Sequence, residues 1–199
     1  MLIVITSEAF LSAEITQIKQ MIDLGLKHVH VRKPQATLEE LRNWLQNFEP
    51  RYLAKMMLHQ HHVLGEELGC KGVHFKEHQR NTQDKTFIKK LKNFRSNGFQ
   101  VSTSFHKLDD LKSNAVFFDY AFLSPVFTSI SKVGYEGIQF EVHDIPENCI
   151  ALGGITSEKI EEAYPLGFCG VAVLGAIWMS KNPVNEFIKI KNQYEYIYN

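Results

Sequence analysis

The sequence has few cysteines, no excess of either charge and no long apolar run. Its 199 residues include 22 basic and 22 acidic side chains, so we expect no basic surface for nucleic acid or for an anionic membrane. No apolar run approaches the roughly 18 residues of a membrane-spanning helix. The first residues, MLIVITSEAFL, lack the basic start and small-residue cleavage site of a signal peptide. These absences predict a cytoplasmic protein with no nucleic-acid or membrane partner.

The cysteines are Cys70, Cys149 and Cys169, an odd number without CxxC spacing. Each lies beside an apolar, strand-like run, so we expect buried free thiols and no disulfide framework. Apolar residues make up 44% and charged residues 22% of the chain, which is typical of a globular protein with a core. The length fits one ordinary domain, which we expect to span residues 1–199.

A glycine-centred pattern recurs as DLGLKHVHV from Asp23, ELGCKGVHF from Glu67 and PLGFCGVAV from Pro165. In each copy Leu-Gly ends a helix-like run, two residues follow, and a valine-containing strand begins. A glycine in the left-handed conformation commonly ends a helix. The pattern therefore predicts repeated helix-to-strand junctions, with SNGFQVSTS from Ser96 as a looser fourth copy.

Short strand-like runs alternate with amphipathic segments along the chain. The predicted strands cover residues 2–6, 28–32, 55–59, 72–75, 100–104, 119–123, 149–153 and 170–175. Strands that alternate with helices pair in parallel, and eight such units favour a closed (β/α)8 TIM barrel. Residues 127–142 contain Gly134 and Gly137 and predict a long loop in place of one helix.

Functional groups of such barrels lie at the carboxyl ends of the strands. After the seventh and eighth predicted strands come ALGGIT and AVLGAIW, where glycine backbone N–H groups can approach an anion and a helix start adds a favourable dipole. We therefore expect a phosphate-binding cradle, although tight turns alone would also explain these glycines. The cradle residues are Gly153, Gly154, Gly175 and Ala176.

The segment LSPVFTSISKVG supplies hydroxyl groups and the cation of Lys132, which together can close over a phosphate or diphosphate. Histidines crowd other strand ends, and neutral imidazoles could converge on zinc. Because no aspartate ligands accompany them, a zinc site is the less favoured interpretation. The histidines concerned are His30, His59, His61, His62, His74, His78 and His106.

In order and approximate spacing, GVHF, TSFH, LSPVFTSISK, ALGGIT and GVAVLGAI resemble motifs of thiamin phosphate synthase and its TenI-like relatives, over about residues 2 to 178. The resemblance implies a compact TIM barrel. It also implies a transferase that joins an aminopyrimidine diphosphate to a thiazole phosphate, releases diphosphate and uses Mg2+.

The resemblance implies roles for individual residues. Arg32 matches an arginine that binds diphosphate, and Lys132 matches a loop lysine that neutralises the leaving group. Ser129 and Ser131 stand where the family has phosphate-binding threonines. Further matches are Ser104, near the reacting centre, and Gly154 and Gly175, the backbone donors around the thiazole phosphate.

The chain departs from the synthase pattern at several positions. His30 replaces a glutamine, and Pro34 replaces a lysine unless Lys33 has taken over its role. His59 and Gln60 occupy the place of Asn-Asp after the third strand. Gln60 and Gln79 therefore stand at the expected Mg2+-ligand positions, where a neutral amide is a poorer ligand than a carboxylate. We expect Mg2+ only if the synthase interpretation holds, and otherwise no cofactor.

The TenI-like branch aromatises a thiazole by proton transfer and expects a histidine where this chain has Pro125. His106, His30 or His78 could act as the base instead. The sequence thus leaves open a synthase, a diverged paralogue of it, a thiazole tautomerase, and a noncatalytic binder of thiazole phosphate or thiamin phosphate. A zinc hydrolase is a remote alternative, and a homo-oligomer is compatible with each.

Overall fold

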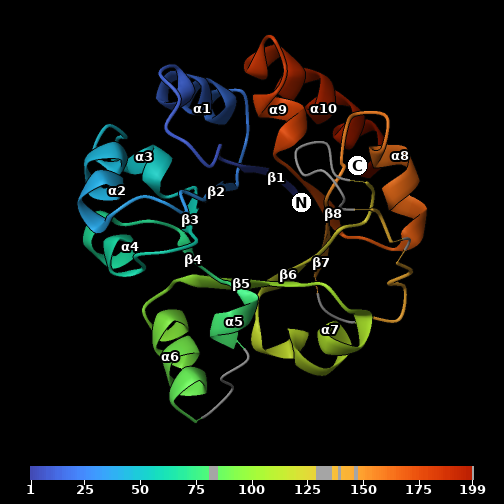
Figure 1. Ribbon diagram of the computed structural model, residues 1–199, viewed down its shortest axis with the longest axis horizontal. Helices are drawn as coiled ribbons and strands as arrows, with labels where there is room; N and C mark the ends of the chain where they lie inside the picture. Colours follow the sequence, from blue (N-terminus) through green and yellow to red (C-terminus); the bar gives the residue numbers. More distant parts are fainter. Residues whose placement is uncertain (81–84, 129–135, 139, 146–147, 199) are drawn as a thin grey trace.

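The structure, a computed structural model, describes residues 1–80, 85–128, 136–138, 140–145 and 148–198. Eight parallel strands form a closed barrel in which β1 pairs with β8 (Figure 1). The strands are β1 (Leu2–Ile5), β2 (Val29–Val31), β3 (Met56–Leu58), β4 (Gly72–Phe75), β5 (Gln100–Phe105), β6 (Tyr120–Leu123), β7 (Cys149–Leu152) and β8 (Gly170–Val173). The predicted TIM barrel is confirmed, and the largest displacement of a strand end is at β8, predicted to end at residue 175 and observed to end at Val173.

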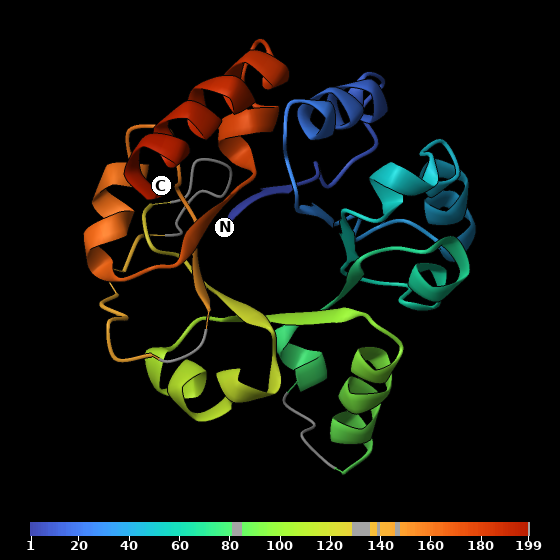
Figure 2. The same cartoon turned by 180° about the vertical axis from the view of Figure 1, so that it is seen from behind.

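Helices surround the barrel on its outside, as the two opposite views show (Figures 1 and 2). Between β6 and β7, the described residues form no helix, in agreement with the predicted long loop. The helices are α1 (Glu14–Asp23), α2 (Leu38–Leu45), α3 (Pro50–Leu53), α4 (Val63–Leu68), α5 (Glu77–Arg80), α6 (Lys85–Ser96), α7 (Leu108–Asn114), α8 (Ile160–Ala163), α9 (Gly175–Trp178) and α10 (Pro183–Tyr198), with 3-10 turns η1 (Ala115–Phe117) and η2 (Tyr164–Leu166).

The repeated glycines act as the sequence predicts. Gly25, Gly69, Gly98 and Gly167 all have positive φ, between 71° and 104°. Gly69, for example, is the left-handed residue that ends α4 three residues before β4 begins. These conformations turn the chain from the helix layer back into the barrel.

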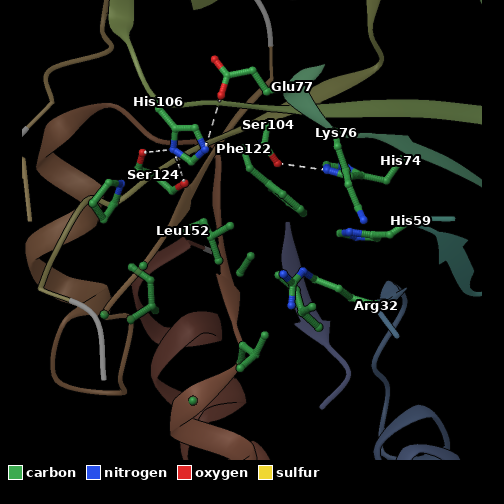
Figure 3. A pocket seen from close by; sticks show the side chains of 18 of the residues that line it. Arg32, His59, His74, Lys76, Glu77, Ser104, His106, Phe122, Ser124 and Leu152 are labelled. Atoms are coloured by element: carbon green, nitrogen blue, oxygen red, sulfur yellow. Dashed lines mark hydrogen bonds and ion pairs between the residues drawn. The ribbon is translucent and has the colours of Figure 1, made fainter. Parts of the chain in front are cut away.

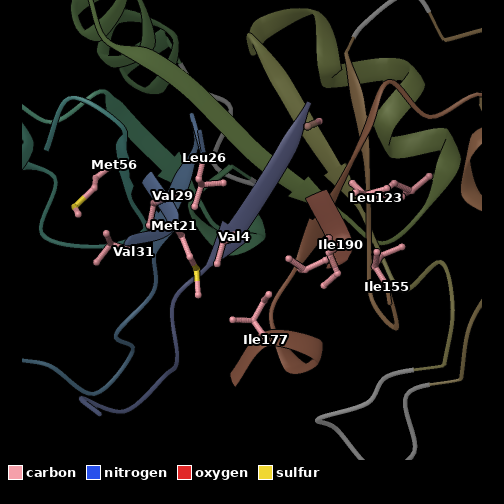
Figure 4. Close-up of a cluster of buried hydrophobic side chains, with 14 of the residues drawn as sticks. Val4, Met21, Leu26, Val29, Val31, Met56, Leu123, Ile155, Ile177 and Ile190 are labelled. Carbon is pink, nitrogen blue, oxygen red and sulfur yellow. The ribbon is translucent and has the colours of Figure 1, made fainter. Parts of the chain in front are cut away.

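Alternation along each strand separates two apolar layers. Ile3 and Ile5 of β1 point into the barrel with Met57 and Phe122. Val4 points outward instead and belongs to the larger cluster between the barrel and the helices, which includes Val29, Val31 and Met21 of α1 (Figure 4). The same parity directs the side chains just beyond each strand toward the barrel mouth or away from it.

Two of the three cysteine predictions are confirmed, because Cys70 and Cys149 are buried. Cys169 is exposed, contrary to prediction, since it lies in the turn between η2 and the start of β8. All three thiols are free. Among the described residues, no helix combines the length and apolar character needed to span a membrane.

Candidate functional site

A cavity of about 310 Å3 opens at the carboxyl ends of the strands (Figure 3). Every strand, or the residue directly after it, contributes to its lining. Of the predicted site residues, the structure brings seven together here: Arg32, His59, Ser104, His106, Gly153, Gly154 and Gly175. The cavity is therefore the predicted barrel mouth.

The first side of the cavity carries two cations, Arg32 after β2 and Lys76 after β4. Arg32 forms an ion pair with Glu8 of the loop after β1. Burial, followed by the charge of Arg32, lowers the pKa of the Lys76 ammonium, while Glu8 acts in the opposite direction. The two positive charges thus act on each other within one pocket.

The second side is formed by the backbone after β7 and β8. Gly153 and Gly154 have φ of +97° and +65°, and a Cβ on Gly154 would lie 2.4 Å from the carbonyl oxygen of Thr128. The loop after β6 packs directly on them, because Phe127 N–H donates to the Gly153 carbonyl (3.1 Å). Both glycines are needed for this close approach, and together with Gly175 they line the pocket.

A cluster of buried histidines forms the floor. His30 Nδ1 lies 2.9 Å from His59 Nε2, and His30 Nε2 lies 2.6 Å from the Tyr120 hydroxyl. The His74 ring stacks on that of His59 with centroids 4.0 Å apart. Burial lowers the pKa of all three imidazoles, that of His74 to about 3, so the rings are neutral at pH 7.

In the described part of the chain, His30, His59 and His74 are the one group of at least three possible metal ligands, with ligand atoms within 4.8 Å of one another. However, the two nitrogens of His74 lie 2.9 Å and 3.0 Å from the hydroxyls of Ser102 and Ser104. Both His30 nitrogens are also in hydrogen bonds. A metal ion would have to replace these bonds, so the geometry favours a hydrogen-bonded network that reaches the pocket at His59 and Ser104.

His106 stands at the opposite rim. Its Nδ1–H donates to the Ser124 carbonyl (2.8 Å), so the tautomer with a single proton keeps that proton on Nδ1 and has its lone pair on Nε2. Glu77 lies 3.8 Å from Nε2. His106 is thus held by its first nitrogen and presents its second at the pocket rim (Figure 3).

Comparison with known families adds the decisive observation, since a family model described as thiamine monophosphate synthase matches residues 1–177. The chain belongs to the thiamine monophosphate synthase family. This confirms the family resemblance that the motifs indicated. The pocket described above lies entirely within the matched residues.

Individual relatives agree with the thiamine monophosphate synthase assignment. A thiamine-phosphate synthase of Bacteroides fragilis (strain YCH46) is 26% identical over 189 residues, 87% of this chain and 90% of that protein. The thiamine phosphate pyrophosphorylase structure from Bacteroides thetaiotaomicron has a TM-score of 0.73 and 24% identity, covering 98% of this chain and 97% of that chain. The one from Pyrococcus furiosus has a TM-score of 0.79 and 16% identity, covering 100% and 96%. These two structures support the fold.

The positions expected to bind Mg2+ in this family carry neutral amides, which are poorer ligands for a hard cation than carboxylates. Gln60 donates through Nε2 to the Lys33 carbonyl and lies outside the pocket lining. Gln79 accepts the Lys76 backbone N–H through Oε1 (2.9 Å) and also lies outside the lining. Each amide makes one hydrogen bond to the protein's own backbone, and the buried Gln60 Oε1 has no hydrogen-bond partner. We therefore derive no step through Mg2+ at these positions.

Lys33 does not reach the pocket, although it follows Arg32 directly. Its ammonium is buried and donates to Glu14 Oε2 (2.5 Å) and to the carbonyls of Ser7 and Ala9 (both 2.8 Å). Burial lowers the pKa of Lys33 and raises that of Glu14. Lys33 thus ties β2 to α1 and its preceding loop, and the structure corrects its predicted role in phosphate binding.

Three further predicted residues lie beside the pocket but do not line it. His30 belongs to the floor cluster without reaching the lining, Ala176 packs against the core between barrel and helices, and His78 is exposed on α5. Ser129, Ser131 and Lys132 lie outside the described residues. The site residue that the motifs did not single out is Lys76.

Proposed function

We propose that this protein joins an aminopyrimidine diphosphate to a thiazole phosphate and releases diphosphate. The carrying observation is a single pocket with Arg32 and Lys76 on one side and the backbone of Gly153, Gly154 and Gly175 on the other. Two separate phosphate-binding sides suit two phosphorylated substrates. Family membership supports the same reaction, although the replaced Mg2+ positions make this chain a diverged member.

In this proposal Arg32 binds the diphosphate, whose departure is the bond-breaking step. Cations near the leaving oxygens stabilise the charge that develops there. Lys132, a match to the family's loop lysine, would contribute a further cation, with Ser129 and Ser131 as phosphate ligands. Gly154 and Gly175 would receive the thiazole phosphate.

Ser104 is placed to contact the reacting pyrimidine. Its hydroxyl lines the pocket and is oriented by His74 Nε2 at 3.0 Å. Because His74 is held on its other side by Ser102, the Ser104 hydroxyl has a fixed direction. We assign His59, which also lines the pocket, to the same substrate half.

The test is to mix the purified protein with both substrates and to follow thiamin phosphate by chromatography, with and without added Mg2+. The proposal expects turnover that requires both substrates. If no thiamin phosphate forms under either condition, the synthase proposal fails. Binding of thiazole phosphate by the same inactive preparation would then identify a noncatalytic member.

A thiazole tautomerase is the second candidate, and the geometry of His106 favours it. Its Nδ1–H is fixed on the Ser124 carbonyl, so Nε2 can take and return a proton at the pocket rim. The discriminating substrate is the unaromatised thiazole carboxylate phosphate alone, and the discriminating variant is His106→Gln. Loss of isomerisation in this variant, but not in the exposed His78→Gln variant, would support the tautomerase.

A further inference from the structure

The end of β4 brings a second cation to the side of the pocket that holds Arg32. His74 of β4 points into the barrel, and Lys76, two residues later, has the same parity and lines the pocket. In the view of Figure 3 the Lys76 side chain extends past His74 and ends beside His59, on the side of the pocket where Arg32 lies. The placement follows from strand geometry and does not depend on a flexible surface lysine.

The charges around Lys76 are few. Arg32 adds a like charge, and Glu8 and Glu77 are the carboxylates that line the same pocket. Glu8 is half-exposed, with 47% of its side chain accessible, and is paired with Arg32. His59 and His74 are neutral at pH 7 because burial lowers their pKa. An entering anion therefore meets two cations and has to displace one carboxylate, Glu8, which can turn into water.

We propose that Lys76 and Arg32 bind the diphosphate group directly, so that the Lys76 ammonium supplies the positive charge that Mg2+ would otherwise bring. This inference rests on the proposed function, because it assumes that the pocket receives a diphosphate ester. A lysine ammonium is a compact point charge with three donors, and an arginine offers a fork that matches two phosphate oxygens. Together they can hold both phosphate groups of one diphosphate.

The residues at the two positions expected to hold Mg2+ support this substitution. Both positions expected to hold Mg2+ carry neutral amides, which are poorer ligands for a hard cation than carboxylates; Gln60 Nε2 donates to the Lys33 carbonyl, and Gln79 Oε1 accepts the Lys76 backbone N–H. The Gln79 bond fixes the backbone from which the Lys76 side chain extends. Gln79 thus fixes the backbone of Lys76 while presenting no carboxylate to a metal ion.

The experiment is calorimetric titration of the protein with inorganic diphosphate, once in EDTA and once with Mg2+. Binding is expected in EDTA, with a Kd within about threefold of the value in Mg2+. Lys76→Met should weaken binding in EDTA roughly 10- to 100-fold, the loss of one charged hydrogen-bonding group. Lys76→Arg should restore most of it.

The matched control is Lys71→Met. Lys71 lies at the other end of the same strand, is also partly buried, and does not line the pocket. The Lys71→Met variant should bind diphosphate with the same Kd as the parent protein. Thermal unfolding of each variant establishes that the fold is intact, and Lys76→Arg keeps the test valid if Lys76→Met unfolds.

The inference is overturned if diphosphate binds only with Mg2+, if it does not bind at all, or if Lys76→Met and Lys71→Met bind equally well. Its failure is separable from that of the proposed function. If thiamin phosphate forms only with Mg2+ and at the same rate in Lys76→Met, the proposed function stands and the inference fails. If diphosphate binds in EDTA in a Lys76-dependent way but no thiamin phosphate forms, the inference stands and the proposed function fails.

Discussion

Hydrogen bonds fix the backbone of Arg32, while its side chain lines the pocket. Its N–H donates to Thr6 Oγ1 (2.9 Å), and its carbonyl accepts from the same hydroxyl (3.3 Å). Thr6 follows β1 directly. Hydrogen bonds between the ends of β1 and β2 therefore fix the backbone from which the Arg32 side chain extends. The barrel itself thus sets the position of Arg32, which with Lys76 forms the proposed diphosphate side.

Arg32→Gln should lower kcat/KM for thiamin phosphate formation roughly 10- to 100-fold, because a charged hydrogen bond to the substrate is lost. Steady-state kinetics with each substrate varied measures the change. Arg42→Gln is the control, since Arg42 pairs with Glu39 and Glu67 on the outer helices. Equal rates for both variants would remove Arg32 from the diphosphate site.

The buried pair of Lys33 and Glu14 gives a prediction about stability. Glu14→Gln leaves the Lys33 ammonium without its counter-charge and should lower the free energy of unfolding by about 3–5 kcal/mol. Glu39→Gln breaks an exposed pair and should cost at most about 1 kcal/mol. Urea denaturation compares the two, and similar losses would show that Lys33 finds other partners.

The buried histidines give the protein a pH dependence of known sign. Burial lowers the pKa of His62 from 6.5 to about 4, and its Nε2–H donates to the His74 carbonyl (3.1 Å). The unfolded chain thus binds more protons between these values, and stability falls as the pH falls from 6.5 toward 4.

His62→Gln should therefore reduce the stability lost between pH 7 and pH 5 by about 1–2 kcal/mol relative to the parent. Urea denaturation at the two pH values measures this difference. The exposed His78→Gln variant is the control for removing a histidine without changing the interior. A parent-like pH dependence in His62→Gln would contradict the assignment.

At the scale of elements, the β6–β7 loop and the end of β7 depend on each other. Val126 N–H donates to the Leu152 carbonyl (2.9 Å), and Ile138 N–H donates to the Pro125 carbonyl (2.9 Å). These bonds lay the loop across Gly153 and Gly154. The two glycines therefore determine how residues 125–128 approach the pocket.

Gly154→Ala should destabilise the protein by about 2–4 kcal/mol, because strain at φ +65° adds to a Cβ placed 2.4 Å from the Thr128 carbonyl oxygen. Gly98→Ala is the matched control, with φ +81° and no atom within 4 Å of its Cβ. It should cost only about 1 kcal/mol. Urea denaturation showing equal losses would mean that the loop yields easily at Gly154.

Most elements could be predicted because local chemistry determines them. Glycine-ended helices and alternating apolar strands mark each unit, and Thr37 with Glu40 forms the capping box that starts α2. The direction of single side chains was harder. Arg32 and Lys33 form one basic pair in the sequence, but strand alternation sends Arg32 to the pocket and Lys33 to Glu14. The same alternation after His74 brings Lys76, at the end of β4, to the pocket.

The buried polar network could not be predicted for a different reason. His30, His59 and His74 come from three strands, and their partners Tyr120 and Ser102 come from two more. Which ring meets which hydroxyl depends on barrel closure and register, which no local pattern contains. In the sequence, a zinc site is the less favoured interpretation only because no aspartates accompany the histidines, and the hydrogen bonds that argue against a metal are visible only in the structure.

At the scale of the whole molecule, barrel closure turns eight separate strand ends into one pocket with two unlike sides. The cations lie after β2 and β4, and the glycine backbone lies after β7 and β8, across the barrel. Two phosphorylated compounds can therefore be held face to face over a floor of neutral imidazoles. We propose that the protein joins these two compounds and releases diphosphate.

The most direct measurement is 31P nuclear magnetic resonance of a single mixture of protein, aminopyrimidine diphosphate and thiazole phosphate. If the protein joins the two substrates, the signals of both should decline together while thiamin phosphate and free diphosphate appear in equal amounts. The Arg32→Gln variant should show the same products at a much lower rate. Unchanged substrate signals, or release of diphosphate without thiamin phosphate, would contradict this proposal.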